Sequence, residues 1–373
     1  MTVSELPVAP ADTRAAWVDR LRVVGIAGVV VVHVGTASLV PIGWYYEERI
    51  ESELLEGALF LLIAPLANFG LGPLFVVGGM MAAHSLARRG PASFVRARLL
   101  RLGVPVLVVF FLVDPVADFW GTVAEGGDRP LSAFLSDFRG DRDIGVFWFV
   151  LALLAFNLVY AAWRGFRAAP RASGGELAAG VLGTLALLIV ATDAVVWLRW
   201  DYLTEHLWNL RWAQWPQSGA LFVLGVVLAE RRLVVTRALA RWCGILAAGG
   251  TLAFLVALVL GTRVGVDGAD LTLWGNVAVA PVSAVVALAF SVWVLDLFRR
   301  HDPHVGPIEA RAARASYAAY LVHPLVLVAL SAAARPIPWS PAAKFVLVAT
   351  VGVPTVFAVG HLLTRIPGVR RVL

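Results

Sequence analysis

The sequence predicts an all-α, polytopic transmembrane helical bundle of about ten helices. Of the 373 residues, 60% are hydrophobic and 15% are charged, whereas an ordinary soluble domain is only roughly half apolar. Nearly all the apolar residues fall into runs of about 18 or more, the length that an α-helix needs to cross the hydrocarbon core. Lys and Arg gather in alternate connections between these runs, as in multi-pass membrane proteins. We therefore expect the lipid bilayer to surround the chain.

The apolar runs divide into ten predicted spans. The stretch from Leu54 to Leu86 exceeds one untilted crossing, and Pro65 and Pro73 interrupt it, so its first part is expected to lie in the membrane interface. Tryptophans near the predicted outer ends indicate an aromatic belt, and they are Trp44, Trp120, Trp200, Trp215 and Trp339. The spans are residues 21–40, 62–87, 102–120, 146–163, 177–198, 214–230, 243–261, 274–297, 315–334 and 342–363.

The distribution of charge predicts the orientation. One set of alternate connections holds 22 of the 31 Lys and Arg residues, and such residues resist translocation. We therefore expect that set, and both termini, on the cytoplasmic side. No connection is long enough to bury a core of its own. The chain is accordingly expected to be one membrane-embedded domain, residues 1–373, with a cytoplasmic N-terminal segment at 1–20 and a cytoplasmic tail at 364–373.

Cysteine content and charge pattern argue against two kinds of site. Cys243 is the single cysteine, which rules out an intrachain disulfide framework and a multi-cysteine metal site. The basic residues sit at helix ends and do not alternate with exposed aromatic residues, as a nucleic-acid groove would require. We expect no metal and no nucleic acid.

The first span carries a deeply placed imidazole. Ten residues separate Arg22 from His33, so the two side chains share one helical face, and His33 lies about 16 Å deeper, close to the bilayer midplane. An ionisable residue at that depth is a functional hypothesis by default. In the alternative interpretation, His33 bonds to a neighbouring helix for packing and Arg22 anchors the cytoplasmic end.

The first cytoplasmic loop leads into a basic helix start. Arg98 and Arg101 lie three residues apart, between Phe94 and Pro105, and therefore project from one helical face. Guanidinium groups pair well with phosphate oxygens, so this rim could hold the anionic end of a phosphorylated cofactor. Positive-inside topology explains the same residues without a ligand, and the local sequence does not decide between these interpretations.

The ninth span carries a polar stripe. Ser316, Tyr320 and His323 lie at i, i+4 and i+7, and such a stripe on an apolar helix is expected to face inward. Pro324 should loosen the helix after His323 and free a backbone carbonyl that needs a partner. Tyr320 could equally be a core aromatic residue whose hydroxyl is satisfied.

Carboxylates and a tryptophan mark the outer ends of other spans. Asp114 and Asp118 are one turn apart, and Asp193 lies near the end of the fifth span. Carboxylates that face a vestibule suit recognition of a polyhydroxy acceptor. The plainer interpretation makes them rim residues in water, or partners for Arg199 and Arg211. The ordinary interpretation of Trp148 is likewise an interface aromatic residue.

Five segments together resemble the integral-membrane acyltransferase type 3 family. Its first-span pattern of Arg, ten residues and His is matched by Arg22 and His33, and its cytoplasmic Arg-x-x-Arg pattern by Arg98 and Arg101. The other similar segments are Gly72-Pro73-Leu74-Phe75-Val-Val-Gly78-Gly79, in which glycine replaces the family's serine, Phe147-Trp148-Phe149-Val150, and Ser316-Tyr317-Ala-Ala-Tyr320-Leu-Val-His323-Pro324. The order of the segments over most of the chain carries the resemblance. The opening third also looks similar to the branch associated with glucan biosynthesis.

The resemblance implies an O-acyltransferase of the bacterial cytoplasmic (inner) membrane. Its donor would be cytoplasmic acyl-CoA, either acetyl-CoA or succinyl-CoA. Its acceptor would be a hydroxyl of an extracytoplasmic glycan, glycolipid or related carbohydrate-containing molecule, as in polysaccharide O-acetylation. A transporter that uses intramembrane residues such as His33, Asp114 and His323 is the alternative, although the sequence shows no inverted repeat.

The resemblance also implies roles for the residues named above. His33, with Arg22, is the expected catalytic residue, and it either takes the proton of the attacking hydroxyl or carries the acyl group. Tyr320 and His323 would line the cavity and orient the thioester carbonyl. The expected donor-binding residues are Arg22, Arg98, Arg101 and Ser316, and the expected acceptor-binding residues are Asp114, Asp118 and Trp148.

Overall fold

The structure is a computed structural model that describes residues 16–39, 44–136, 144–168, 170, 172–199, 210–263, 279–301, 306–370 and 372. It is 83% helical. The β-pairing among the described residues is limited to one isolated bridge, between Glu176 and Val234. The predicted all-α fold class is confirmed. Trp200, residues 274–278 of the eighth predicted span, residue 40 and most of the N-terminal segment lie outside the described residues.

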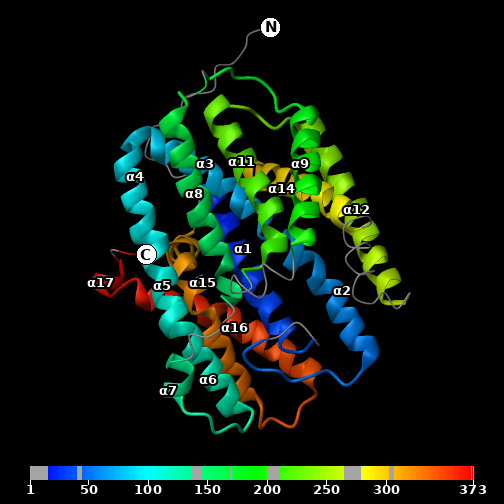
Figure 1. The fold of residues 1–373 in the computed structure, drawn as a ribbon. Helices are drawn as coiled ribbons and strands as arrows, with labels where there is room; N and C mark the ends of the chain where they lie inside the picture. Colours follow the sequence, from blue (N-terminus) through cyan, green and yellow to red (C-terminus); the bar gives the residue numbers. More distant parts are fainter. Residues whose placement is uncertain are drawn as a thin grey trace.

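The chain folds into a series of helices joined by short connections (Figure 1). The α-helices are α1 Ala16–Thr36, α2 Glu53–Phe69, α3 Gly72–Arg89, α4 Pro91–Arg98, α5 Val104–Val108, α6 Asp114–Ala124, α7 Leu131–Ser136, α8 Trp148–Phe166, α9 Ala179–Leu198, α11 Trp215–Arg231, α12 Arg237–Arg263, α14 Ala280–Arg300, α15 Pro307–Ala334, α16 Pro341–Leu363 and α17 Pro367–Arg370. The π-helical segments η1 Leu99–Gly103 and η2 Val109–Val113 join α4, α5 and α6 into one helical path, and the 3-10 segments η3 Gly145–Phe147 and η4 Trp212–Gln214 precede α8 and α11.

Eight segments within the described residues are long and apolar enough to cross a membrane. Each coincides with one predicted span, which confirms a multi-pass membrane protein. The other two predicted spans, the first and the sixth, are α1 and α11. Helix α1 is long enough but differs from the other eight because three charged residues lie in its first two turns. Helix α11 differs in its length, which is 17 residues.

The long second apolar run is divided at a glycine. The run forms α2 and α3, which meet at Gly70 and Leu71. Pro73 lies in the first turn of α3, where its missing N–H leaves no hydrogen bond unmade. Pro65 lies inside α2 without ending it. Pro73 thus interrupts the run as predicted, whereas Pro65 does not.

Helix α1 runs through the middle of the bundle (Figure 1). It packs against α2, α3, α14, α15 and α16. Around it, α3 packs on α11, α15 on α16 and α12 on α14. A side chain on much of the surface of α1 therefore meets another helix rather than lipid.

Two ion pairs join the helix ends that carry many of the basic residues, here called the basic end. Arg20 at the start of α1 lies 2.6 Å from Glu309 on α15 and donates to the carbonyl of His301 at the end of α14. Arg164 at the end of α8 lies 3.1 Å from Glu230 at the end of α11. The other end of α1, where the acidic connection of residues 44–52 begins, is here called the opposite end.

Two glycines allow α3 and α11 to approach closely. A Cβ atom on Gly79 would lie 2.0 Å from the carbonyl oxygen of Phe222, and one on Gly225 would lie 1.9 Å from that of Val76. Both obstacles are backbone atoms of the facing helix, so no side-chain movement relieves them. Small residues at such positions are what lets membrane helices pack tightly. Gly79, the second glycine of the Gly78-Gly79 pair, therefore has a packing role.

Gly225→Ala should destabilise the protein by about 1–3 kcal/mol, because the added methyl group overpacks the interface between α3 and α11. The matched control is Gly249→Ala on α12, where nothing lies within 4 Å of the new Cβ. Thermal unfolding of the purified variants in detergent measures both effects. Equal melting temperatures for the two variants would contradict the assigned packing.

Candidate active site

A cavity of about 1310 Å³ follows the length of α1. Its wall includes Leu21 near the start of α1 and Thr36 at its end, which are about 22 Å apart along the helix axis. Residues of α2, α6, α8, α14 and α15 and of the connection after α1 also line it. The cavity therefore extends from the basic end towards the opposite end.

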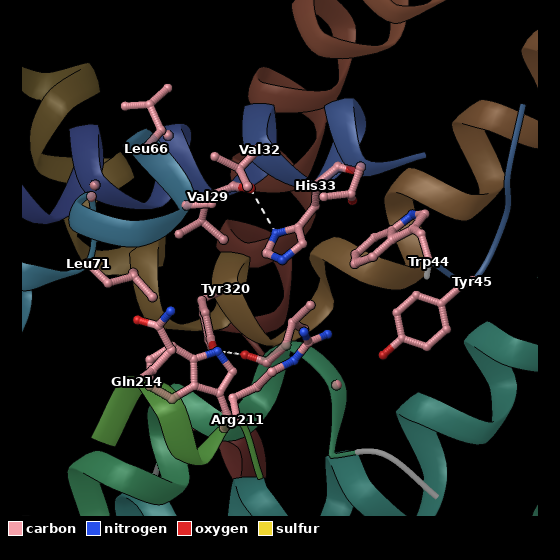
Figure 2. A pocket seen from close by; sticks show the side chains of 18 of the residues that line it. Val29, Val32, His33, Trp44, Tyr45, Leu66, Leu71, Arg211, Gln214 and Tyr320 are labelled. Carbon is pink, nitrogen blue, oxygen red and sulfur yellow. Dashed lines mark hydrogen bonds between the residues drawn. The ribbon is translucent and has the colours of Figure 1, made fainter. Parts of the chain in front are cut away.

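His33 projects into this cavity from α1. Its Nδ1 lies 2.8 Å from the carbonyl oxygen of Val29, and because a carbonyl can only accept, Nδ1 carries the hydrogen. In the neutral ring, Nε2 then holds a lone pair. Figure 2 shows the ring hanging from α1 with its other nitrogen directed away from that helix. This nitrogen is suited to act as a base or as a nucleophile.

His33 lies in the last turn of α1 rather than halfway along it. The helix begins at Ala16 and ends at Thr36, so it is shifted towards the N-terminus from the predicted span of residues 21–40. The shift arises because the charged first turns remain helical, with Arg20 paired to Glu309. His33 is therefore not at the midpoint of the helix that forms, and its depth in the bilayer stays a prediction.

A second imidazole lies beside the first. The Nδ1 of His323 donates to the carbonyl of Tyr320. That carbonyl is the one that Pro324 leaves without an intrahelical N–H, so the predicted freed carbonyl is confirmed and His323 satisfies it. The Nε2 of His323 is buried and has no hydrogen-bond partner within the described part of the chain. Both neutral rings thus keep an Nε2 lone pair, but of the two only His33 lines the cavity, so the expectation that His323 lines it is wrong.

Aromatic rings surround His33. The indole of Trp44 stacks on it, with ring centroids 4.7 Å apart and an angle of 23° between the planes. The ring of His323 lies 4.9 Å from His33 and 6.4 Å from Trp44, so the three rings form a compact triangle. Trp44 was predicted to belong to the interface belt, and that prediction is wrong because the connection after α1 folds back over His33. Trp120 and Trp339 are about half exposed, as a belt requires.

The polar stripe of α15 faces inward as predicted. Ser316, Tyr320 and His323 are 1%, 2% and 0% exposed. Tyr320 lines the cavity, but its hydroxyl donates to the carbonyl of Val146. The Ser316 hydroxyl donates to the carbonyl of Ala313 at 2.9 Å, and Ser316 is not part of the cavity wall. Both hydroxyl hydrogens are engaged by the backbone.

The predicted phosphate-binding arginines lie around the basic end and outside the cavity wall. Arg22 lies one residue beyond Leu21 and pairs with Asp19 at 3.5 Å. The guanidinium of Arg98 stacks over the ring of Phe94 at 5.0 Å, and Arg101 is exposed. Arg22 alone of the three adjoins a residue of the cavity wall.

The path of α4 to α6 is tied to α15 near these arginines. Pro105 lacks an N–H, so the carbonyl of Arg101 has no donor four residues on. The hydroxyl of Tyr317 supplies one at 2.8 Å. The Arg-x-x-Arg segment is thereby joined to the helix that carries His323.

Asp114, Asp118 and Trp148 all line the cavity. Asp114 is only 5% exposed and accepts a hydrogen bond from the hydroxyl of Tyr45, so it is not a rim residue in water. Asp193, by contrast, is buried on α9 and is absent from the cavity wall. The three predicted acceptor residues are thus brought together with His33, whereas Asp193 is not.

Sequence reasoning missed Asn68 and Gln214 on the cavity wall, and it named Arg211 only as a possible partner of the outer carboxylates. All three residues line the cavity, and Figure 2 shows Arg211 and Gln214 across the cavity from His33. The Nε2 of Gln214 lies 3.5 Å from the side-chain oxygen of Asn68, and Gln217 donates to the carbonyl of Asn68 at 2.8 Å. Amide side chains within apolar spans were the available signal.

A family model for an acyltransferase domain matches residues 15–361. No curated protein and no solved structure matches the chain. The matched range contains all the segments that carry the resemblance, and it favours acyl transfer over transport. Together with the spanning helices, the match identifies a membrane acyltransferase. The chain therefore belongs to the integral-membrane acyltransferase type 3 family.

Proposed function

We propose that the protein transfers an acyl group, acetyl or succinyl, from cytoplasmic acyl-CoA to a hydroxyl of an extracytoplasmic carbohydrate-containing acceptor. The observation that carries this proposal is one cavity that follows α1 from the basic end and holds His33 near the opposite end. A donor entering at the basic end and an acceptor entering at the opposite end would meet at that imidazole. The proposal places the basic end in the cytoplasm, in keeping with the charge distribution.

The chemistry needs one group that first takes and then gives a proton. As the acceptor oxygen bonds to the thioester carbonyl carbon, His33 Nε2 takes the hydroxyl proton. The C–S bond then breaks, and the imidazolium returns the proton to the departing thiolate, leaving an ester and a free thiol. The same lone pair would attack the carbonyl if an acyl-imidazole formed first. Both routes require the tautomer that the Val29 carbonyl imposes on His33.

The cavity wall differs between its two ends. Towards the basic end it is apolar, with Leu21, Val24 and Phe298, which suits an uncharged donor arm and leaves the CoA phosphates at the rim. There Arg22, and on the neighbouring helical path Arg98 and Arg101, would supply guanidinium partners.

Towards the opposite end the cavity wall is polar. Asp114, Asp118 and Glu125 line it together with Trp44 and Trp148. Carboxylates accept several hydrogen bonds from hydroxyl groups, and flat aromatic faces pack against apolar ring surfaces. This combination supports an acceptor that carries many hydroxyl groups.

His33→Ala should lower acyl transfer by roughly 10²- to 10⁴-fold, the usual contribution of a positioned acid–base group. The matched control is His84→Ala. His84 makes the same kind of bond from Nδ1 to a carbonyl four residues earlier, at 2.7 Å to Met80, but it is exposed and outside the cavity wall. Release of labelled acyl product by the purified, folded variants measures the effect. Near-normal transfer by His33→Ala would refute the role of His33.

Arg98→Ala and Arg101→Ala should each weaken binding of acyl-CoA by roughly tenfold or more, since a hydrogen bond to a charged group contributes about 1.5–3 kcal/mol. Arg88→Ala, which removes an exposed charge at the end of α3, should leave the affinity unchanged. Calorimetric titration with acetyl-CoA or succinyl-CoA measures all three. If the first two variants bind as the wild type does, topology alone explains these arginines.

Asp118→Asn should raise the KM for the acceptor by roughly tenfold or more while the affinity for the donor stays the same. The expected cause is the loss of a charged hydrogen-bond acceptor from the cavity wall. Asp128→Asn alters an exposed carboxylate near the same end that does not line the cavity, and it should change neither quantity. Steady-state kinetics with each substrate varied in turn separates the effects, and an unchanged acceptor KM would remove Asp118 from the acceptor site.

A further inference from the structure

Residues 44–50, here called the strap, are fastened to the elements around the opposite end of the cavity. The backbone N–H of Glu48 donates to the carbonyl of Ala37 at 2.8 Å, just after α1. The backbone N–H of Glu47 donates to the carboxylate of Glu125, just after α6, at 2.9 Å. The strap is therefore held from two sides.

The chain's one lysine fastens the strap to α16. Lys344 is 8% exposed, and its Nζ lies 2.6 Å from the carboxylate of Glu48 and 2.9 Å from the carbonyl of Arg335. A buried charge is costly unless it is paired and hydrogen-bonded. Tyr46 also donates to Glu48, at 3.2 Å, and burial, together with the Glu48 charge, raises the pKa of Tyr46 to about 12. The Tyr46 hydroxyl therefore keeps its hydrogen at neutral pH.

Two glycines leave the space that Tyr45 of the strap occupies. A Cβ atom on Gly121 of α6 would lie 1.6 Å from the carbonyl oxygen of Tyr45. Gly145 has a φ of +55°, and its Cβ would lie 2.9 Å from the Tyr45 hydroxyl. Backbone and side chain of Tyr45 thus both occupy space that another residue in place of glycine would take.

This fastening determines where Trp44 lies, at the start of the strap. Its indole covers one face of His33, while Val29 holds the Nδ1 edge of the same ring. The His33 ring cannot turn about its Cβ–Cγ bond without displacing the indole, because stacked rings leave no room for the rotating edge. The direction of His33 Nε2 is therefore fixed by a residue eleven positions further along the chain.

We propose that Trp44, held in place by the rest of the strap and by Lys344, is a positioning residue that fixes the His33 ring and limits the access of water to it. The inference rests on the proposed acyl transfer from acyl-CoA. Water that reached the site would attack the thioester carbonyl carbon in place of the acceptor. The C–S bond would break, giving a carboxylic acid and a thiol without transfer. Covering the reactive group against water suppresses this side reaction.

The first experiment tests the contact without any substrate. Diethyl pyrocarbonate transfers an ethoxycarbonyl group to an unprotonated imidazole nitrogen, and mass spectrometry of the purified full-length protein gives the rate at each histidine. Trp44→Ala should label His33 severalfold faster than the wild type, and Trp44→Phe should stay near the wild-type rate. His84 serves as an internal reference. Trp120→Ala, which alters a tryptophan that is 54% exposed, is the matched control.

The second experiment measures the fate of the donor. With acetyl-CoA or succinyl-CoA and no acceptor, Trp44→Ala should release thiol faster than the wild type does. With the cell's own membrane extract as acceptor source, its kcat for ester formation should fall by roughly 10²-fold. The donor KM should stay unchanged. A merely unfolded variant would lose both reactions, so the opposite directions of change distinguish positioning from loss of structure.

Lys344→Met tests whether the contact between Lys344 and Glu48 of the strap affects the His33 ring, which it does not touch directly. It removes the ammonium group while keeping an unbranched side chain, and it should raise His33 labelling in the same direction as Trp44→Ala. Labelling of His33 at the wild-type rate in both variants would overturn the inference. Failure of every variant, wild type included, to consume either thioester would overturn the proposed function and leave the labelling result standing.

Discussion

Two bonds from histidine to backbone carbonyls determine which ring nitrogens of His33 and His323 keep a lone pair. Hydrocarbon offers no water, so a polar group within the membrane is costly unless the protein supplies a partner. His33 satisfies its Nδ1 with Val29, and His323 satisfies the carbonyl that Pro324 leaves free. In each neutral ring this leaves the Nε2 lone pair uncommitted to the helix that carries it. The hydrogen bond that His33 Nδ1 makes to a backbone carbonyl therefore sets the tautomer on which the proposed chemistry depends.

Local rules predicted the parts of the structure that depend on neighbours in sequence. Apolar runs located the spanning helices, helical periodicity turned the stripe of Ser316, Tyr320 and His323 inward, and the geometry of proline freed one carbonyl. The place of Trp44 depends instead on a contact between Glu48 and Lys344 that spans 296 positions. No pattern within a single span contains that information. The boundary of α1 was missed for a related reason, since its charged first turns are stabilised by Glu309.

The same distinction between local patterns and long-range contacts applies to the predicted phosphate-binding arginines. Spacing placed Arg98 and Arg101 on one helical face, but whether such a face borders the cavity depends on how the helical path from α4 to α6 lies against its neighbours. That path contains two π-helical segments, each of which rotates the residues beyond it relative to a regular helix. Tyr317 then joins the path to α15 through the carbonyl of Arg101. The register that results could not be read from a periodicity that assumes an uninterrupted α-helix.

The asymmetry of the cavity gives direction to the proposed reaction. An apolar wall around Val24 offers nothing to a strongly hydrated group, so a polyhydroxy acceptor would leave most of its hydrogen bonds unmade there. The polar wall around Asp114 and Asp118 is correspondingly a poor place for an apolar segment. In the proposed reaction, the cost of desolvation would therefore keep each substrate on its own side without a gate. His33 lies where these two walls meet, and Trp44 covers one face of its ring.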